Sequence, residues 1–154
     1  MSEYAQSPAA QVKQFIIRHL RGVCGGFSLP MPTEQVRGVL DVTGTPKDAW
    51  GIVVDCEDLG DHGGMDTGRV LVDVRPTLTV YTHIDEDADG IMCDSLAAEA
   101  LESVRTLAYS LSGWLCHYSG LWTASGPAMN GAYRVIELAA TLPLNRIDSE
   151  SQED

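Results

Sequence analysis

The sequence predicts an α+β fold, in which an antiparallel β-sheet carries an N-terminal helix and one long internal helix packed on it. Two observations predict the helices: apolar residues recur at helical spacing in 8–21 and again in 94–112. A third predicts the sheet, because apolar and polar residues alternate in 69–82 and in 132–142. The two periodicities occur in separate segments, which is typical of an α+β domain.

Each helix has recognisable end signals. The first starts at Pro8, with Ser7 as its N-cap. The second starts at about Asp94, which is its expected N-cap, and ends at Ser112, with Gly113 at the C′ position. The apolar stripe of the first helix consists of Val12, Phe15, Ile16 and Leu20. That of the second consists of Ala97, Ala100, Leu101, Val104, Ala108 and Leu111. Two interpretations of the first helix stay open: it packs on its own domain, or it docks on a neighbouring subunit.

The strands are predicted by alternation. Residues 50–56 place Trp50, Ile52, Val54 and Cys56 on one face, and a short strand is expected at 36–42. In 69–82, valines and leucines face one way and polar residues the other. Pro76 lies in the middle of that run, so the strand should be bent, bulged or at a sheet edge there. The last strand is expected at 132–142, with Ile136, Leu138, Ala140 and Leu142 on its apolar face.

The chain of 154 residues fits one domain with its own core. We predict a single domain over 1–147 and a disordered acidic tail at 148–154. The N-terminus lacks a signal pattern and no apolar run is long enough to span a membrane, so we expect synthesis in a cytoplasm and no membrane partner. Four widely spaced cysteines are expected to be free thiols: Cys24, Cys56, Cys93 and Cys116.

Acidic residues dominate the charge. There are 22 acids against 10 Lys and Arg, giving a net charge of −12, which argues against tight binding to nucleic acid or to anionic lipid. Acids cluster in a predicted hairpin tip at 57–68 and a loop at 83–90. These clusters contain Glu57, Asp58, Asp61, Asp66, Asp85, Glu86, Asp87 and Asp89. They form either a solubilising surface or the wall of an interface or wet channel.

No motif predicts catalysis, a metal or a cofactor. Asp85, Asp87 and Asp89 match the start of a calcium loop, but the twelfth position is Leu96 where a bidentate Glu is needed. We expect instead a solvated turn ahead of a helix N-terminus. No histidine spacing predicts a transition-metal site, and Cys116 beside His117 is no nucleophile–base pair, because neighbours in extended chain point opposite ways. We therefore predict that the protein is not an enzyme.

The segment 114–131 is rich in large side chains among glycines and serines. Trp114 and Trp122 either cap the open end of the core or form a contact patch, since Trp and Tyr are common anchors at interfaces.

The order of elements resembles the tail terminators, or tail completion proteins, of tailed bacteriophages. The resemblance rests on an amphipathic N-terminal helix, the run Arg69-Val-Leu-Val-Asp-Val-Arg-Pro-Thr-Leu-Thr-Val-Tyr81, a loop, a helix with an Ala/Leu stripe, and the run Ala132-Tyr-Arg-Val-Ile-Glu-Leu-Ala-Ala-Thr-Leu142. It covers roughly 8–144 and is a likeness of pattern, without a diagnostic motif. No functional residue is transferred position by position.

The resemblance implies a structural virion protein that acts by binding. Such a protein forms a ring, a hexamer, that caps the tail tube, joins it to the head-completion or neck proteins, and lets DNA pass without specific binding. Six copies at −12 each carry roughly −70 before screening, so an acidic bore would repel the DNA backbone. The acids of the two clusters, with Trp114 and Trp122, are the candidates for the lumen or the interface.

Two alternatives remain. One is a small ligand-binding or hydrolytic α+β domain that uses 114–122 as a pocket wall. The other is a different phage connector, a head-tail stopper, which would have more β-structure and no strong internal helix.

Overall fold

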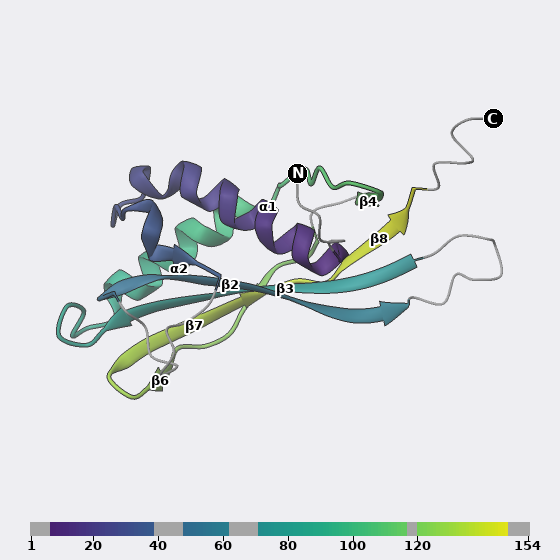
Figure 1. Cartoon of the computed structure of the whole chain (residues 1–154). Helices are drawn as coiled ribbons and strands as arrows, with labels where there is room; N and C mark the ends of the chain where they lie inside the picture. Colours follow the sequence, from purple (N-terminus) through teal and green to yellow (C-terminus); the bar gives the residue numbers. More distant parts are fainter. Residues whose placement is uncertain (1–6, 39–47, 62–70, 117–119, 148–154) are drawn as a thin grey trace.

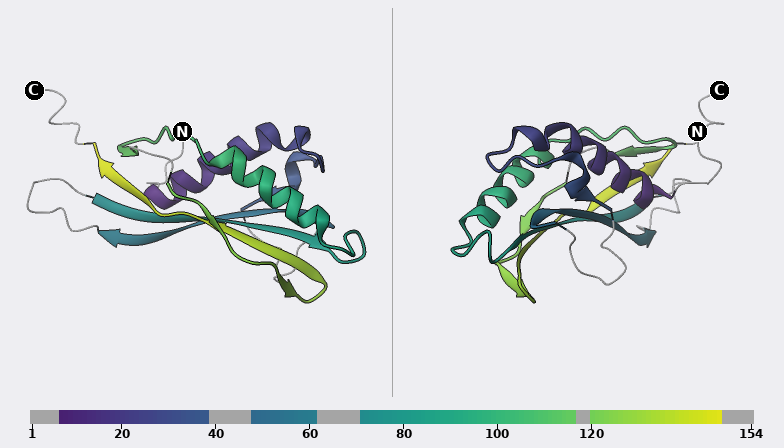
Figure 2. Two further views of the ribbon diagram at one scale, coloured as in Figure 1. Left: turned by 180° about the vertical axis from the view of Figure 1, so that it is seen from behind. Right: turned by 60° about the vertical axis from the view of Figure 1, so that its left-hand side comes forward.

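The computed structural model describes residues 7–38, 48–61, 71–116 and 120–147. Within them, two α-helices lie on one face of a twisted eight-stranded sheet (Figures 1 and 2). The predicted α+β class is therefore confirmed. The described residues share one hydrophobic core between helices and sheet, and no helix among them is long and apolar enough to cross a membrane.

The sheet is built around one central strand. Its strands are β1 (Val36–Arg37), β2 (Trp50–Asp61), β3 (Leu71–His83), β4 (Trp114–Cys116), β5 (Thr123–Ala124), β6 (Ala128–Asn130), β7 (Tyr133–Ala139) and β8 (Leu142–Arg146). β3 pairs antiparallel with β2 on one side, and with β7 and then β8 on the other. β5 and β6 extend the sheet beyond β7, and β4 extends it beyond β8. β1 runs parallel to β2, so the sheet is mixed but largely antiparallel.

Pro76 lies in the central strand of the sheet and its pairing with β2 has no bulge there. Neither a sheet edge nor a bulge therefore explains how the strand accommodates a proline. Cys56 of β2 is its partner on one side. On the other side, the neighbour of β3 changes from β8 to β7. The carbonyl of Pro76 accepts the N–H of Ala140, the residue between those two strands, at 3.2 Å. In a strand, the N–H of a residue points to the same side as its carbonyl, so the N–H that proline lacks would also face Ala140. At this point neither β7 nor β8 pairs with β3, so no ladder hydrogen bond is lost. The same break in the pairing also divides the predicted strand 132–142 in two.

Helix α1 (Pro8–Val23) begins as predicted and ends two residues later. The hydroxyl of Ser7 accepts the N–H of Ala10 at 3.1 Å, which is an N-cap contact. Its buried residues are Ala9, Val12, Ile16 and Leu20. Phe15 is only partly buried and packs against Tyr109, with ring centroids 5.3 Å apart. The stripe therefore faces this chain's own sheet, which favours the domain-packing interpretation of the helix.

Helix α2 (Ile91–Val104) differs from the predicted 94–112 at both ends. Its N-cap is Gly90, in the left-handed region at φ 80°, and not Asp94, which lies in the first turn. After Val104 the chain leaves the helix and buries Leu107. The side chain of Gln11 then holds Ser112, accepting its N–H at 2.6 Å and donating to its carbonyl at 3.0 Å. The helical spacing of the later residues is thus overridden by tertiary contacts.

Gly113 has φ 83° and lies in the turn between Leu111 and Trp114, which form a β-bridge, rather than at a helix end. In the same way, 114–131 is not only loop, because it contains β4, β5 and β6. Of the strand expected at 36–42, the structure has Val36–Arg37, and residues 39–42 lie outside the described part.

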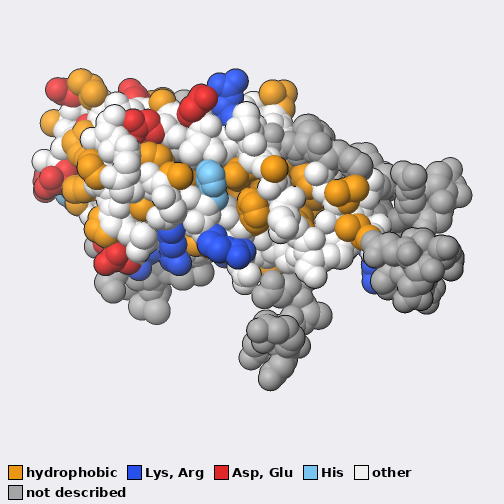
Figure 3. Space-filling model, turned by 90° about the horizontal axis from the view of Figure 1, so that it is seen from above, with side chains coloured by type: hydrophobic (Ala, Val, Ile, Leu, Met, Phe, Trp, Pro, Cys, Tyr) orange, Lys and Arg blue, Asp and Glu red, His pale blue; other side chains and the backbone are white. Residues whose placement is uncertain are grey.

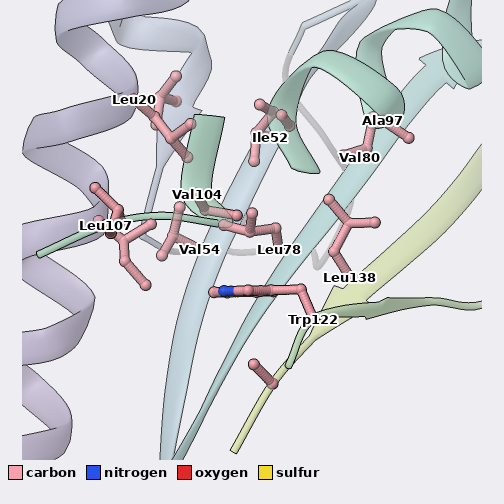
Figure 4. Packing of buried hydrophobic residues seen from close by; sticks show 14 of the residues in the cluster. Leu20, Ile52, Val54, Leu78, Val80, Ala97, Val104, Leu107, Trp122 and Leu138 are labelled. Carbon is pink, nitrogen blue, oxygen red and sulfur yellow. The ribbon is translucent and has the colours of Figure 1, made fainter. Parts of the chain in front are cut away.

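The core confirms the alternation in the long strands (Figure 4). Ile52 and Val54 of β2 meet Val80 and Leu78 of β3 in register, and all four are fully buried. On β7, β8 and the residues between them, Ile136, Leu138, Ala140 and Leu142 are buried, as predicted, and Ala139 and Leu144 are buried as well. None of the four cysteines forms a disulfide, also as predicted.

We predict that Gly51→Ala lowers the free energy of unfolding by about 1–3 kcal/mol. A Cβ on Gly51 would lie 2.5 Å from the hydroxyl oxygen of Tyr81 and 2.6 Å from the backbone oxygen of Gln35. Gly22→Ala is the matched control, because a Cβ there meets nothing within 4 Å and alanine favours a helix by up to about 1 kcal/mol. Urea unfolding of both variants measures the difference, and equal stability of the two would contradict the packing at Gly51.

Candidate functional site

The first acidic cluster lies on a strand and not only on a hairpin tip. β2 continues to Asp61, so Glu57, Asp58 and Asp61 belong to it, whereas the prediction placed them in a loop. Glu57 and Asp58 are exposed. Asp66 lies outside the described residues.

This part of β2 is a sheet edge. β1 pairs only with Ile52 and Val53, so no described strand covers β2 beyond them. A β-bulge interrupts its pairing with β3 between Asp58 and Gly60, and the N–H of Gly60 donates to the Asp58 carboxylate at 2.9 Å. Charges and bulges on an edge strand discourage another strand from adding to it. We call Val54–Asp61 the acidic edge.

The second acidic cluster is the loop between β3 and α2, and three of its four acids are exposed. These are Asp85, Glu86 and Asp89, and the Asp85 side chain is 82% exposed. The N–H of Asp85 donates to Nδ1 of His83 at 3.1 Å, which fixes the first turn. On the helix-covered face, acidic side chains gather mainly toward the end of the molecule where this loop lies (Figure 3).

Asp87 is the exception, because it is only 4% exposed and cannot line a lumen or an interface. Its carboxylate accepts the hydroxyl of Thr82 at 2.9 Å and the N–H groups of Met92 and Cys93 at 3.0 and 2.9 Å. Burial alone would raise the pKa of Asp87, but these hydrogen bonds outweigh it and hold the pKa below its ordinary value. Asp87 therefore caps α2, a role that we had predicted for Asp94.

The contacts of Asp87 also explain why the calcium-loop pattern does not form a cation site in this structure. Both carboxylate oxygens of Asp87 are already bound to N–H and O–H donors of the protein. Within the described part of the chain, no group of three His, Cys, Asp or Glu residues is arranged to hold a metal ion.

The two tryptophans belong to the core side of the sheet. Trp122 is 7% exposed and lies among the buried residues of the sheet and α2 (Figure 4), while Trp114 is half-buried against the same core. This favours the core-capping interpretation. The large apolar side chains that do reach solvent in this region are their neighbours Leu115, Leu121 and Met129, which the sequence analysis did not single out.

An open pocket of about 470 Å³ lies on the face of the sheet away from the helices. It is lined by Leu59, Arg75, Leu121, Thr123, Ala139, Ala140 and Thr141. Arg75 supplies the positive charge in this lining, so the pocket suits an apolar group with an anionic end. Neither Trp114 nor Trp122 lines it, and Leu121 is the one described residue of the predicted pocket wall at 114–122 that does.

The thiols are unsuited to nucleophilic chemistry. Burial raises the pKa of Cys24 and Cys93, and burial together with the nearby Asp55 and Asp58 raises that of Cys56 to about 12. These three thiols therefore stay protonated near neutral pH, whereas the thiolate is the reactive form. Cys116 is half-buried, and its neighbour His117 lies outside the described residues.

Comparison with known proteins identifies a shared fold. No protein-family model matches this chain, and no curated protein sequence matches it. Among solved structures, the chain is similar to one from the virion of a native gene transfer agent particle, with a TM-score of 0.60 and 15% sequence identity. That match covers 93% of this chain and 99% of the other. A second solved protein, whose name describes no function, matches with a TM-score of 0.53 and 12% identity over 90% and 94% of the two chains.

We predict that Asp87→Asn lowers the free energy of unfolding by about 2–3 kcal/mol, because it weakens hydrogen bonds to a buried charge. The folded-state pKa of Asp87 is below its ordinary value, so its contribution is complete above the unfolded-state pKa. The contribution disappears as the pH falls through the lower folded-state pKa. The stability difference between Asp87→Asn and the wild type should therefore shrink below about pH 4.

Asp85→Asn is the matched control for this prediction, since it removes one charge from the same loop at an exposed side chain. It should change stability by less than about 0.5 kcal/mol. Chemical unfolding at pH 7 and at pH 3 tests both variants, and a loss for Asp87→Asn that is equally large at both values would contradict the charged cap.

Proposed function

We propose that this protein is a structural component of a phage-like virion, and specifically a tail terminator. It forms a ring, a hexamer, that caps the tail tube and joins it to the head-completion or neck proteins. The observation that carries the proposal is the fold likeness to a chain of a gene transfer agent virion, which extends over nearly the whole of both chains. The predicted order of elements, which the resemblance to tail terminators used, agrees with the observed order in its main parts.

The exposed acids supply the surface that such a ring needs. DNA passing through a bore is repelled by negative charge on the wall, so it does not adhere. Asp85, Glu86 and Asp89 project from one rigid loop, and Glu57 and Asp58 project from the acidic edge. Asp87 is excluded from this role because its carboxylate is bound inside the protein.

The β2–β3 hairpin supplies a protruding arm. Its paired strands extend beyond both helices (Figure 1), so their far ends are not covered by the helical layer. Twelve residues of β2 at ~3.3 Å each span about 40 Å. Only part of this length lies beyond the helices, and that end of the hairpin suits contact with a neighbouring subunit or with the tube.

A ligand-binding domain is the second candidate, and the pocket beside Arg75 is what favours it. A chain that stays monomeric and binds a small amphipathic anion there would support this alternative. The stopper alternative is less favoured, because the described residues include the internal helix α2, 14 residues long.

The first test is the mass of the protein in solution. We expect light scattering after size-exclusion chromatography to show a ring-sized oligomer, alone or on addition of tail-tube protein, and negative-stain images to show rings at tube ends. Electrostatic repulsion between copies at −12 each should make assembly weaker at low salt than at physiological salt. A chain that stays monomeric and never binds a tube contradicts the proposal.

The second test concerns the acidic bore. We expect Asp85→Asn, Glu86→Gln and Asp89→Asn together to slow DNA release from particles by about two- to tenfold, because the wall loses its repulsion. The control combines Glu34→Gln, Glu102→Gln and Glu137→Gln, which remove the same charge from exposed side chains elsewhere. Release that is unchanged by the loop variant, or slowed equally by the control, would argue against the loop as part of the bore.

A further inference from the structure

One long edge of the sheet is free of charged side chains. Residues 106–133 contain no Asp, Glu, Lys or Arg, a run of 28 residues in a chain that is 21% charged. This run contains β4, β5 and β6, which together form the edge opposite β2. We call the described residues 114–116 and 120–130, which include these three strands, the uncharged edge; the left panel of Figure 2 shows the molecule from behind.

Large apolar side chains lie in solvent along this run. Leu121 is 81% exposed, Met129 is 52% exposed and Leu115 is 46% exposed. Other members of the same run, Leu107 and Trp122, are buried in the core. Burial in the core therefore explains why part of this run is uncharged. It does not explain the lack of charge around the apolar side chains that lie in solvent.

The two edges of the sheet contrast in chemistry. The acidic edge has charges and a bulge, the usual devices that stop another strand from adding. In its described residues the uncharged edge has no charged group, and β6 exposes all three of its residues. Depletion of charge and exposed Met and Leu beside aromatic residues are typical of the centre of a protein interface.

The distribution of charge on the chain indicates which surface a second copy can approach. Two copies at −12 repel each other, so they approach most easily where acids are fewest. Most exposed acids of the described chain lie elsewhere: on the acidic edge, on the β3–α2 loop, on α2 at Asp94 and Glu102, and at Glu34. The exception is Glu137 of β7, the strand with which β5 and β6 pair. Burying any of these without a partner charge would be costly.

We propose that a second copy of this chain covers the uncharged edge. This inference rests on the proposed ring and identifies one half of its subunit contact. Leu121 and Met129 are the central contact residues, and Leu115 extends the contact along β4. In a head-to-tail ring, the neighbour presents a different surface to this edge, and the contact repeats from subunit to subunit.

The test introduces one acid into the edge. Leu121→Asp and Met129→Asp each place an unpaired charge in the contact, and each should raise the dissociation constant of self-association about a hundredfold or more. Both side chains are largely in solvent within one copy, so circular dichroism and the thermal midpoint should match the wild type. Ile91→Asp is the matched control, because Ile91 is 65% exposed but lies on α2, away from the edge, and assembly should be unchanged.

The outcomes separate this inference from the proposed function. Wild-type assembly that persists in both edge variants overturns the inference and leaves the ring proposal intact. Loss of tube binding with normal self-association also overturns it, and makes the tube protein the occupant of the edge. Wild-type dimers that never form rings, but are disrupted by both edge variants, support the inference and reject the ring. A wild type that is monomeric at every concentration, and that neither self-associates nor binds on addition of tail-tube protein, rejects both.

Discussion

The double pairing of β3 is the constraint on which the rest of this structure depends. β2 lies along one side of it, and β7 followed by β8 lies along the other. Its alternate residues Val74, Leu78 and Val80 are fully buried beneath the helices. A proline is tolerated in so central a strand because the neighbouring ladder breaks beside it, where Ala140 donates to the Pro76 carbonyl.

The junction between β3 and α2 shows how one loop separates structural from surface carboxylates. Asp87 points inward and ties the end of β3, through Thr82, to the first N–H groups of α2. The helix dipole and the hydrogen bonds stabilise its charge despite burial. Because that anchor fixes the loop, Asp85, Glu86 and Asp89 are held in solvent. In the ring that we propose, these three acids would be presented by a loop whose position is tied to β3 and α2.

The sheet has two unlike edges, and this asymmetry suits an assembly of identical copies. The acidic edge resists strand addition, whereas the uncharged edge exposes Leu121 and Met129. A contact in which the uncharged edge of one copy meets a different surface of the next is heterologous, and heterologous contacts close into rings when the rotation between copies allows it. Charge distribution and sheet topology thus agree with the ring that we propose.

The sequence by itself determined which residues face the core. Alternation identified Ile52, Val54, Leu78 and Leu138, and the Ser7–Pro8 signal identified the start of α1, because periodicity and capping are local properties of the chain. The uncharged run at 106–133 was also visible in the sequence, but its meaning depends on three short strands that no local pattern predicts. Only the tertiary structure decided where α2 begins and ends, that Asp87 is buried, and that Pro76 faces a break between two strands. Each of these depends on a partner distant in sequence or on the neighbouring strand, and the free energy of such contacts outweighs the weak local preferences that sequence patterns report.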